Sequence, residues 1–147
     1  MKKTQIALAA DHAGYETKEI IKHYLHQGGY EVKDFGTDSD ESTDYPDYAH
    51  PLAESVESGE CELGFTFCGS GNGISMTANK HQGIRSALCW NEEIAALARQ
   101  HNDANVCSIP ARFVSAEKAL NIGKTFLNSE FEGGRHMRRV SKISRDS

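Results

Sequence analysis

Short apolar segments alternate with segments of helical periodicity along the chain of 147 residues. The apolar segments have the length of buried strands, and they lie at 6–10, 30–35, 63–67, 84–90 and 104–109. The segments between them predict helices. Strands that alternate with helices form a parallel sheet covered on both faces. The sequence therefore predicts an α/β fold, a three-layer, doubly wound and Rossmann-like sandwich with a five-stranded parallel sheet.

Local signals mark the ends of several expected helices. The first begins at Tyr15, and Gly28-Gly29 ends it in the way that glycine ends many helices. Asn91 and Ser115 are placed to cap the helices that follow the fourth and fifth strands. These signals agree with the alternating pattern.

Two further helices are expected in the middle of the chain. One covers 48–58, where Pro51 is compatible only with the first helical turn. The other is short and covers 73–80. Between the second strand and the first of these helices lies an acidic loop, 36–44, which contains no apolar residue.

The length and composition fit one domain, 1–147, with a sizeable core. Charged residues make up 25% of the chain and the net charge is -5, so neither nucleic acid nor an anionic membrane is expected as a partner. No apolar run approaches the roughly 20 residues of a membrane helix. The basic start resembles a signal peptide, but Asp11-His12 interrupts the apolar stretch, which favours a buried strand.

The chain has four cysteines, and no two of them have C-x-x-C spacing. Neither a zinc ribbon nor a redox dithiol is therefore indicated, and no metal is expected. Cysteines in apolar runs behave as small hydrophobic residues. The pattern indicates a reduced, cytoplasmic protein.

The segment Cys68-Gly69-Ser70-Gly71-Asn72-Gly73 follows the third apolar run directly. Glycine allows backbone N–H groups to approach a ligand closely, and N–H groups at the start of a helix bind anions. Amide donors beside a thiol favour its thiolate form. A thiol next to an anion hole suits proton transfer beside a carbonyl group, whereas a plain tight turn with a buried cysteine is the structural alternative.

The same glycine loop does not fit a dinucleotide site. The dinucleotide fingerprint would require a third glycine at position 74, which is Ile74, and the fingerprint normally follows the first strand rather than the third. A nicotinamide cofactor is therefore not expected.

Polar groups follow four of the expected strands: Asp11-His12, Cys68, Asn91 and Arg112. Ligands of parallel sheets bind at the carboxyl ends of the strands, so these groups predict an active site at one edge. A helix cap with a surface histidine is the alternative for Asp11-His12.

The basic tail, 129–147, contains Arg135 and Arg139, which share one face if the tail is helical. Two guanidinium groups on one face suit a phosphate. A solvated charge run is the alternative, and the absence of interleaved aromatic residues gives no support to RNA binding.

Six motifs together resemble the family of ribose-5-phosphate isomerase type B, which also contains the galactose-6-phosphate isomerase subunits. The resemblance covers nearly the whole chain. The motifs are Ala10-Asp11-His12-Ala13-Gly14, Asp44-Tyr45-Pro46-Asp47, Cys68-Gly69-Ser70-Gly71-Asn72-Gly73, Ala78-Asn79-Lys80, His101-Asn102-Asp103-Ala104-Asn105, and Gly134-Arg135-His136 with Arg138-Arg139.

The resemblance implies an aldose–ketose isomerase that interconverts ribose 5-phosphate and ribulose 5-phosphate through an enediolate, with no metal and no cofactor. Cys68 would be the base that moves the proton between C2 and C1. One branch of the family uses a cysteine here and the other a glutamate just after the last loop glycine; residue 74 is Ile74, so the chain is similar to the cysteine branch.

The resemblance also implies roles for the other site residues. His101 would open the furanose ring, and Ser70 would assist at the sugar oxygens. The remaining expected substrate-binding residues are Asp11, His12, Tyr45, Gly69, Gly71, Asn72, Gly73, Asn102, Arg112, Arg135 and Arg139.

The family site is built at a dimer interface, so the resemblance implies a homodimer or tetramer with shared active sites, to which the basic tail contributes. The phosphorylated sugar is the expected substrate. A hexose 6-phosphate, of allose or galactose, is the alternative substrate, and a non-catalytic sugar-phosphate binding module is the alternative from another class.

Overall fold

A computed structural model describes residues 4–145 of the chain. Residues 1–3 and 146–147, the ends of the expected domain and of the basic tail, lie outside the described residues. Five parallel strands form a sheet in the order β2-β1-β3-β5-β4, which confirms the predicted sheet. The strands are β1 (Gln5–Ala10), β2 (Glu31–Asp34), β3 (Leu63–Cys68), β4 (Ser86–Leu88) and β5 (Val106–Pro110).

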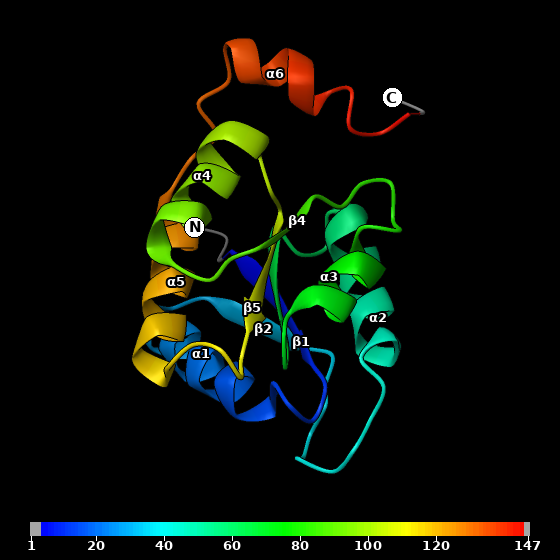
Figure 1. The fold of residues 1–147 in the computed structure, drawn as a ribbon, viewed down its shortest axis with the longest axis vertical. Coiled ribbons are helices and arrows are strands. Elements are labelled where there is room, and N and C mark those ends of the chain that lie inside the picture. Colours follow the sequence, from blue (N-terminus) through cyan, green and yellow to red (C-terminus); the bar gives the residue numbers. More distant parts are fainter. Residues whose placement is uncertain (1–3, 146–147) are drawn as a thin grey trace.

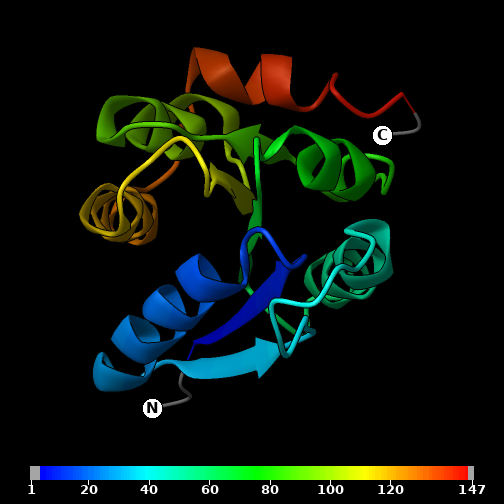
Figure 2. The same cartoon turned by 60° about the horizontal axis from the view of Figure 1, so that its bottom comes forward.

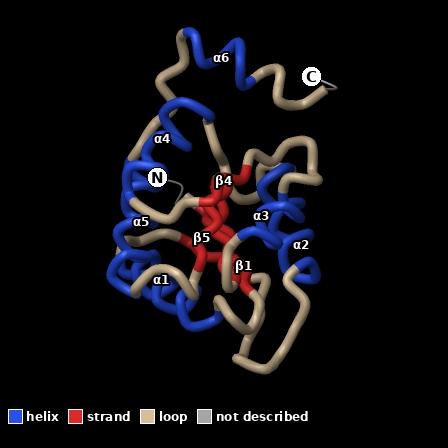
Figure 3. Tube along the Cα trace, viewed as in Figure 1, coloured by secondary structure: helices blue, strands red, loops and turns tan. Residues whose placement is uncertain are grey.

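Helices cover both faces of this sheet and complete the predicted three layers. Figure 2 shows α1, α4 and α5 on one side of the sheet and α2 and α3 on the other, and Figure 3 shows the strands between them. The short helix α6 lies apart from these layers, beyond the end of α4 (Figure 1). The helices are α1 (Tyr15–Gln27), α2 (Pro46–Glu57), α3 (Asn72–Ala78), α4 (Glu92–Asn102), α5 (Ala116–Asn128) and α6 (Arg135–Val140).

The central strands are buried on both faces, as parallel strands between helices must be. Alternate residues of β1 and β3 point to opposite sides. Leu8 and Phe65 belong to the apolar cluster that contains Ile21 of α1 and Ile122 of α5, whereas Ala7 belongs to the cluster formed with α2. The sheet thus separates two apolar cores.

The expected helix ends are present in the structure. Gly28 caps α1, and Gly29 adopts a φ of 84° that glycine tolerates. The Asn91 side chain accepts a hydrogen bond from the Ile94 amide at 2.9 Å. The Ser115 hydroxyl accepts one from the Lys118 amide at 3.0 Å.

The prediction for α2 was wrong about Pro51. The helix begins at Pro46, two residues earlier than expected, so Pro51 lies inside it. Proline favours the first helical position because its missing N–H would have no partner there. Pro46 therefore sets the start of the helix, and the chain tolerates one missing backbone hydrogen bond at Pro51.

Two other elements are shorter than expected. The fourth strand, expected over 84–90, spans only Ser86–Leu88, and α3 spans Asn72–Ala78. The Arg85 amide donates to the Asn105 side-chain oxygen at 2.8 Å, whereas the Arg85 carbonyl still accepts from the Asn105 amide at 3.0 Å, so a side chain replaces the backbone partner of the amide alone. Between residues 4 and 145, no helix is long and apolar enough to cross a membrane.

Candidate functional site

Cys68 is the last residue of β3 and lies at the carboxyl edge of the sheet, 5% exposed. Ala10 of β1 pairs with Phe67 of β3, so the next positions along this register are Asp11 and Cys68. The Asp11 amide donates to the Phe67 carbonyl at 3.3 Å, which extends the ladder by one bond. The sheet thus places a carboxylate residue beside the thiol residue.

The Asp11 carboxylate also orders the turn that leads into α1. Its Oδ1 atom accepts hydrogen bonds from the Ala13 amide at 3.0 Å and the Gly14 amide at 3.2 Å. The alternative of Asp11 as a helix cap is wrong, because the N-cap of α1 is Gly14 without a side-chain cap hydrogen bond, and Asp11 accepts its bonds in the preceding turn. Asp11 is also 93% buried at the carboxyl edge, where the expected site lies.

The glycine loop after Cys68 needs glycine for two separate reasons. Gly71 precedes α3 with a φ of 79°, and a Cβ atom there would lie 2.5 Å from Leu88 Cδ1. Gly73 faces the ring of Tyr45, and a Cβ atom there would lie 2.7 Å from the Tyr45 hydroxyl oxygen. The N-cap residue Gly71 has no side chain that could cap α3, and the Asn72 amide of the first turn donates to the Ser70 hydroxyl instead.

Arg112 and Ser70 complete the surroundings of the loop. The Arg112 amide donates to the Gly69 carbonyl at 3.0 Å, and a Cβ atom at Gly69 would lie 3.1 Å from a guanidinium nitrogen of Arg112. The Ser70 hydroxyl accepts a hydrogen bond from the Asn72 amide at 3.2 Å. The loop therefore lies between the Tyr45 ring and the Arg112 guanidinium group.

His12 connects the site to the acidic loop 36–44. The Thr43 amide donates to His12 Nδ1 at 3.2 Å. An imidazole nitrogen that accepts a hydrogen bond carries no proton, so Nε2 carries it in this arrangement. The acidic loop lies at the carboxyl edge, at the bottom of Figure 1.

The other expected site residues lie at the opposite edge of the sheet. His101 and Asn102 are the last two residues of α4, which begins after the carboxyl end of β4 and returns to the start of β5. Arg135 and Arg139 belong to α6, which packs at the far end of α4 (Figure 1). The structure therefore separates the expected site residues into two groups, which we call half-sites, at opposite edges of the sheet.

The ring of His101 stacks on the ring of His136. Their centroids are 4.2 Å apart at an interplanar angle of 13°, and His101 Nε2 lies 3.8 Å from Glu132 Oε1. The pKa of His136 lies below its ordinary value, first because the ring loses hydration and then because the positive charges of His101 and Arg135 repel a proton on it. His136 therefore contacts an expected site residue, although the sequence pattern singled out only its neighbours as site residues.

His101, His136 and Glu132 are also the residues here whose side chains could act as metal ligands. His101, Glu132 and His136 each offer one ligand atom, and these atoms lie within 4.8 Å of one another. The lone pair of an imidazole nitrogen lies in the plane of its ring, so two nearly parallel stacked rings do not direct theirs at one point. The geometry favours ring stacking over metal coordination.

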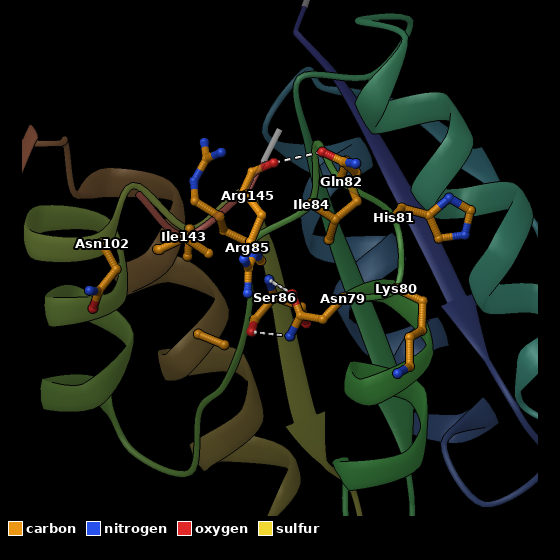
Figure 4. A pocket seen from close by; sticks show the side chains of 13 residues that line it. Asn79, Lys80, His81, Gln82, Ile84, Arg85, Ser86, Asn102, Ile143 and Arg145 are labelled. Atoms are coloured by element: carbon orange, nitrogen blue, oxygen red, sulfur yellow. Dashed lines mark hydrogen bonds between the residues drawn. The ribbon is translucent and has the colours of Figure 1, made fainter. Parts of the chain in front are cut away.

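Asn102 lines a pocket of about 510 Å³. Figure 4 shows Asn102 on one side of the pocket, Asn79 and Ser86 on the other, and Arg85 between them. The pocket is lined by the segment that follows α3, the start of β4, the end of α4 and residues 143–145, and Cys68 does not line it.

Other polar residues have structural contacts, of which the sequence predicted only the cap at Asn91. The side chain of Asn91, one of the four polar groups expected at the carboxyl edge, caps α4. Thr66, Ser75, Ser86 and Ser108 form a chain of hydroxyl groups behind the glycine loop. No spacing pattern could have found these four, because they belong to four different elements.

The family model described as ribose/galactose isomerase matches residues 6–143. Ribose-5-phosphate isomerase B of Escherichia coli (strain K12) is 46% identical over 144 residues, which cover 98% of this chain and 95% of that protein.

Solved structures show the same likeness. The structure of Clostridium thermocellum ribose-5-phosphate isomerase B has a TM-score of 0.95 at 48% identity, covering 97% of each chain. That of ribose-5-phosphate isomerase B from Mycoplasma genitalium, solved with bound ribulose-5-phosphate, has a TM-score of 0.94 at 41% identity, covering 99% of this chain and 97% of the other. The chain described here belongs to the ribose/galactose isomerase family.

Proposed function

We propose that the chain is an aldose–ketose isomerase that interconverts ribose 5-phosphate and ribulose 5-phosphate. The observation that carries the proposal is the position of Cys68 at the carboxyl edge, beside Asp11 and directly before the glycine loop that leads into α3, in a fold shared with a relative solved with ribulose-5-phosphate. The chemistry requires a base beside an anion hole, and we assign the base to Cys68 and the anion hole to the amides of 69–73.

In the proposed reaction, the Cys68 thiolate removes the proton from C2 of the open-chain aldose. The electron pair of the broken C–H bond forms the enediolate, whose oxygens accept hydrogen bonds from the amides of 69–73 and from the Ser70 hydroxyl. A proton passes from the C2 hydroxyl oxygen to O1, and the thiol returns its proton to C1, so that C2 becomes the carbonyl carbon of the ketose. The chemistry consumes no metal and no redox cofactor.

His101 is the proposed acid that opens the furanose ring before proton transfer. Its position at the amino edge, with Asn102, excludes contact with a sugar held at Cys68 of the same chain. We therefore infer a homodimer in which each chain supplies His101 and Asn102 to the Cys68 half-site of its partner. A two-fold axis would create two identical complete sites.

Exposed apolar side chains near both half-sites support this self-association. Trp90 and Phe113 follow β4 and β5 at the carboxyl edge and are 52% and 77% exposed. Met137 of α6 and Ile143 are 55% and 56% exposed at the other half-site. Large apolar residues exposed at two complementary ends of one chain are typical of an interface with a second copy.

The phosphate group of the sugar would be held from both chains. His12 and Arg112 lie in the Cys68 half-site, while Arg135 and Arg139 of the partner would approach with α6. The i,i+4 spacing of these two arginines places both guanidinium groups on one helix face. Binding energy at the phosphate, remote from C1 and C2, helps to orient the reacting carbons.

A hexose 6-phosphate is the second candidate substrate, because the matching family includes galactose isomerases. The acidic loop 36–44 borders the site through the bond between Thr43 and His12, and it is the element that would adapt to a longer sugar. A cytoplasmic location is part of the proposal and agrees with four free, buried cysteines.

The deciding assay follows ketose absorbance after addition of ribose 5-phosphate, with a chelator present and Cys68→Ala as the control. Turnover that resists the chelator and disappears in the variant is the expected result. An inactive wild-type chain would contradict the pentose assignment, and turnover of allose or galactose 6-phosphate would then identify the alternative. Turnover that persists in Cys68→Ala would remove the thiol from its proposed role.

A further inference from the structure

Four hydroxyl side chains form a continuous hydrogen-bonded chain across the sheet. Thr66 and Ser108 lie 2.5 Å apart, Ser108 and Ser86 3.0 Å apart, and Ser86 and Ser75 2.8 Å apart, measured between their hydroxyl oxygens. The chain joins β3, β5, β4 and α3 in that order. Thr66 and Ser108 are fully buried, so each hydroxyl group depends on this network for its hydrogen bonds.

The network connects the strand of the thiol with the helix of the glycine loop. Thr66 and Cys68 are two residues apart on β3, so their side chains lie on the same face of the sheet. That face is the one covered by α2 and α3 (Figure 2). Ser75 belongs to α3, which begins directly after Gly71. The hydroxyl chain therefore spans the space behind the proposed active site.

A second contact joins the C-terminal end of α3 to β4, the strand that contains Ser86. Asn79 accepts a hydrogen bond from the Ser86 amide at 2.8 Å and donates one to the Ser86 carbonyl at 3.0 Å, as Figure 4 shows. Ser86 thus binds α3 near its middle through Ser75 and at its end through Asn79. A helix of 7 residues has little stability of its own, so its place depends on such contacts.

Apolar side chains would bury the same area, but their contacts have no preferred direction. Hydrogen bonds fix both distance and angle, and a fully satisfied buried network holds one arrangement. The amides at the start of α3 must lie within a few tenths of an ångström of the enediolate oxygens to stabilise them. A directional network suits this requirement better than an apolar contact.

We propose that Thr66, Ser108, Ser86 and Ser75 are positioning residues that hold the amides of the glycine loop in register with Cys68. The inference rests on the proposed isomerase function for its kinetic readout. None of the four touches the reacting carbons; they act through α3. Their removal should lower kcat, because transition-state stabilisation depends on the amides, and should leave KM nearly unchanged, because Arg112 and His12 do not belong to the network.

The test compares Thr66→Val with Thr66→Ser. Valine keeps the shape and removes the hydroxyl group, whereas serine keeps the hydroxyl group and leaves a methyl-sized cavity. We expect Thr66→Val to lower kcat about tenfold with KM within about twofold, and Thr66→Ser to stay within about twofold in both constants. Equal kcat in the two variants, or a larger loss in Thr66→Ser, would overturn the proposal.

Ser55→Ala is the matched control. Ser55 is 4% exposed on α2, covers the same face of the sheet, and donates to the Leu52 carbonyl at 2.7 Å, outside the network. It should lower stability in urea without changing kcat. A fall in kcat that follows stability alike in Ser55→Ala and Thr66→Val would assign Thr66 a merely structural role.

Hydrogen exchange provides a readout that does not need turnover. Amides of α3 should exchange faster in Thr66→Val than in Thr66→Ser, while those of α5, on the other face, should not differ. If wild type has no isomerase activity, the proposed function fails and this exchange pattern still decides the network. Equal exchange of α3 in both variants would reject it.

Discussion

Cys68 and His101 lie at opposite edges of the sheet in the same chain. Cys68 is the last residue of β3, whereas His101 precedes the start of β5, whose first residue Val106 pairs with Gly64. Cys68 lies four residue steps beyond Gly64 along the strand, which is about 13 Å at roughly 3.3 Å per residue. One sugar molecule therefore cannot meet both groups within one chain.

Mixing two inactive variants should restore activity if the sites are shared. Cys68→Ala and His101→Ala each damage both sites of a homodimer. In a mixed dimer, one site receives both damaged residues and the other receives neither. Random reassortment makes half of the dimers mixed, so the mixture should recover roughly a quarter of wild-type turnover. The assay is ketose absorbance after the two variants are unfolded and refolded together.

Each variant refolded alone is the control for this experiment and should stay inactive. A refolded mixture that is no more active than the two variants alone would show that each chain uses its own residues, against the shared-site proposal.

Gly73→Ala should displace Tyr45 from the glycine loop. The added methyl group would lie 2.7 Å from the Tyr45 hydroxyl oxygen and 2.8 Å from ring carbon Cε1, so the ring must rotate away. We expect a fall in kcat/KM of about 100-fold, the size associated with a displacement of about 1 Å at a site. Gly69→Ala meets only the flexible end of Arg112, so a smaller loss is expected there.

A double-mutant cycle identifies the cause of the Gly73→Ala defect. In a Tyr45→Ala background the methyl group has no ring to displace, so Gly73→Ala should cost far less activity than in wild type. An undiminished loss in that background would mean that the methyl group blocks the substrate or an amide directly.

Local patterns predicted most of the fold. The five apolar runs all form strands of one parallel sheet, and the caps at Asn91 and Ser115 are present as expected. Such features depend on neighbours in sequence, which a single sequence displays. The short length of β4 could not be predicted in this way, because the Arg85 amide at its start bonds to the Asn105 side chain, which is distant in sequence.

The sequence predicted which chemical groups lie at the carboxyl edge, but it did not predict the long-range side-chain contacts around them. Cys68 and the glycine loop follow a strand, so their place at the carboxyl edge could be derived from the pattern. The stacking of His136 on His101 arises because α6 returns to the end of α4. The bond between Thr66 and Ser108 joins residues 42 positions apart. Such contacts leave no periodic signal.

Pro51→Ala should stabilise the protein. Pro51 lies inside α2 and lacks the amide that would donate to the carbonyl of Asp47, four residues earlier. An interior proline costs about 3 kcal/mol relative to alanine, and the looser unfolded chain of the variant offsets up to about 1 kcal/mol of the gain. Allowing for a helix that is already adapted to proline, we expect a rise of about 1 kcal/mol in the free energy of unfolding, measured in urea.

Pro46→Ala is the matched control, because proline at the first position of α2 lacks only an amide that would have no partner there. It should lower stability slightly or leave it unchanged. A stabilising effect of Pro46→Ala as large as that of Pro51→Ala would show that the missing interior hydrogen bond is not the cause.

Asp34→Asn should destabilise the protein because it leaves a buried ammonium group without its carboxylate. Lys18 is 1% exposed and donates to Asp34 Oδ2 at 2.5 Å, and Lys22 donates to the same oxygen at 3.0 Å. Breaking a buried ion pair by removing one partner costs about 3 kcal/mol. The Asp34 Oδ1 atom accepts from the Gly36 amide at 2.8 Å, so the start of the acidic loop should loosen as well.

The effect of Asp34 depends on pH in a defined direction. Burial raises the pKa of Asp34, but hydrogen bonds from Lys18, Lys22 and Gly36 outweigh burial, so the pKa lies below its ordinary value of 3.8. The unfolded state therefore binds the proton more readily, and the stabilisation is present above about pH 4 and is lost as pH falls through the folded-state pKa. Urea unfolding of wild type and Asp34→Asn should give a difference in the free energy of unfolding that is constant between pH 5 and 7 and shrinks below pH 4.

Glu92→Gln is the control, because it breaks an exposed pair with Lys118, and it should change stability far less. A difference between wild type and Asp34→Asn that grows toward acid pH would contradict the assigned direction.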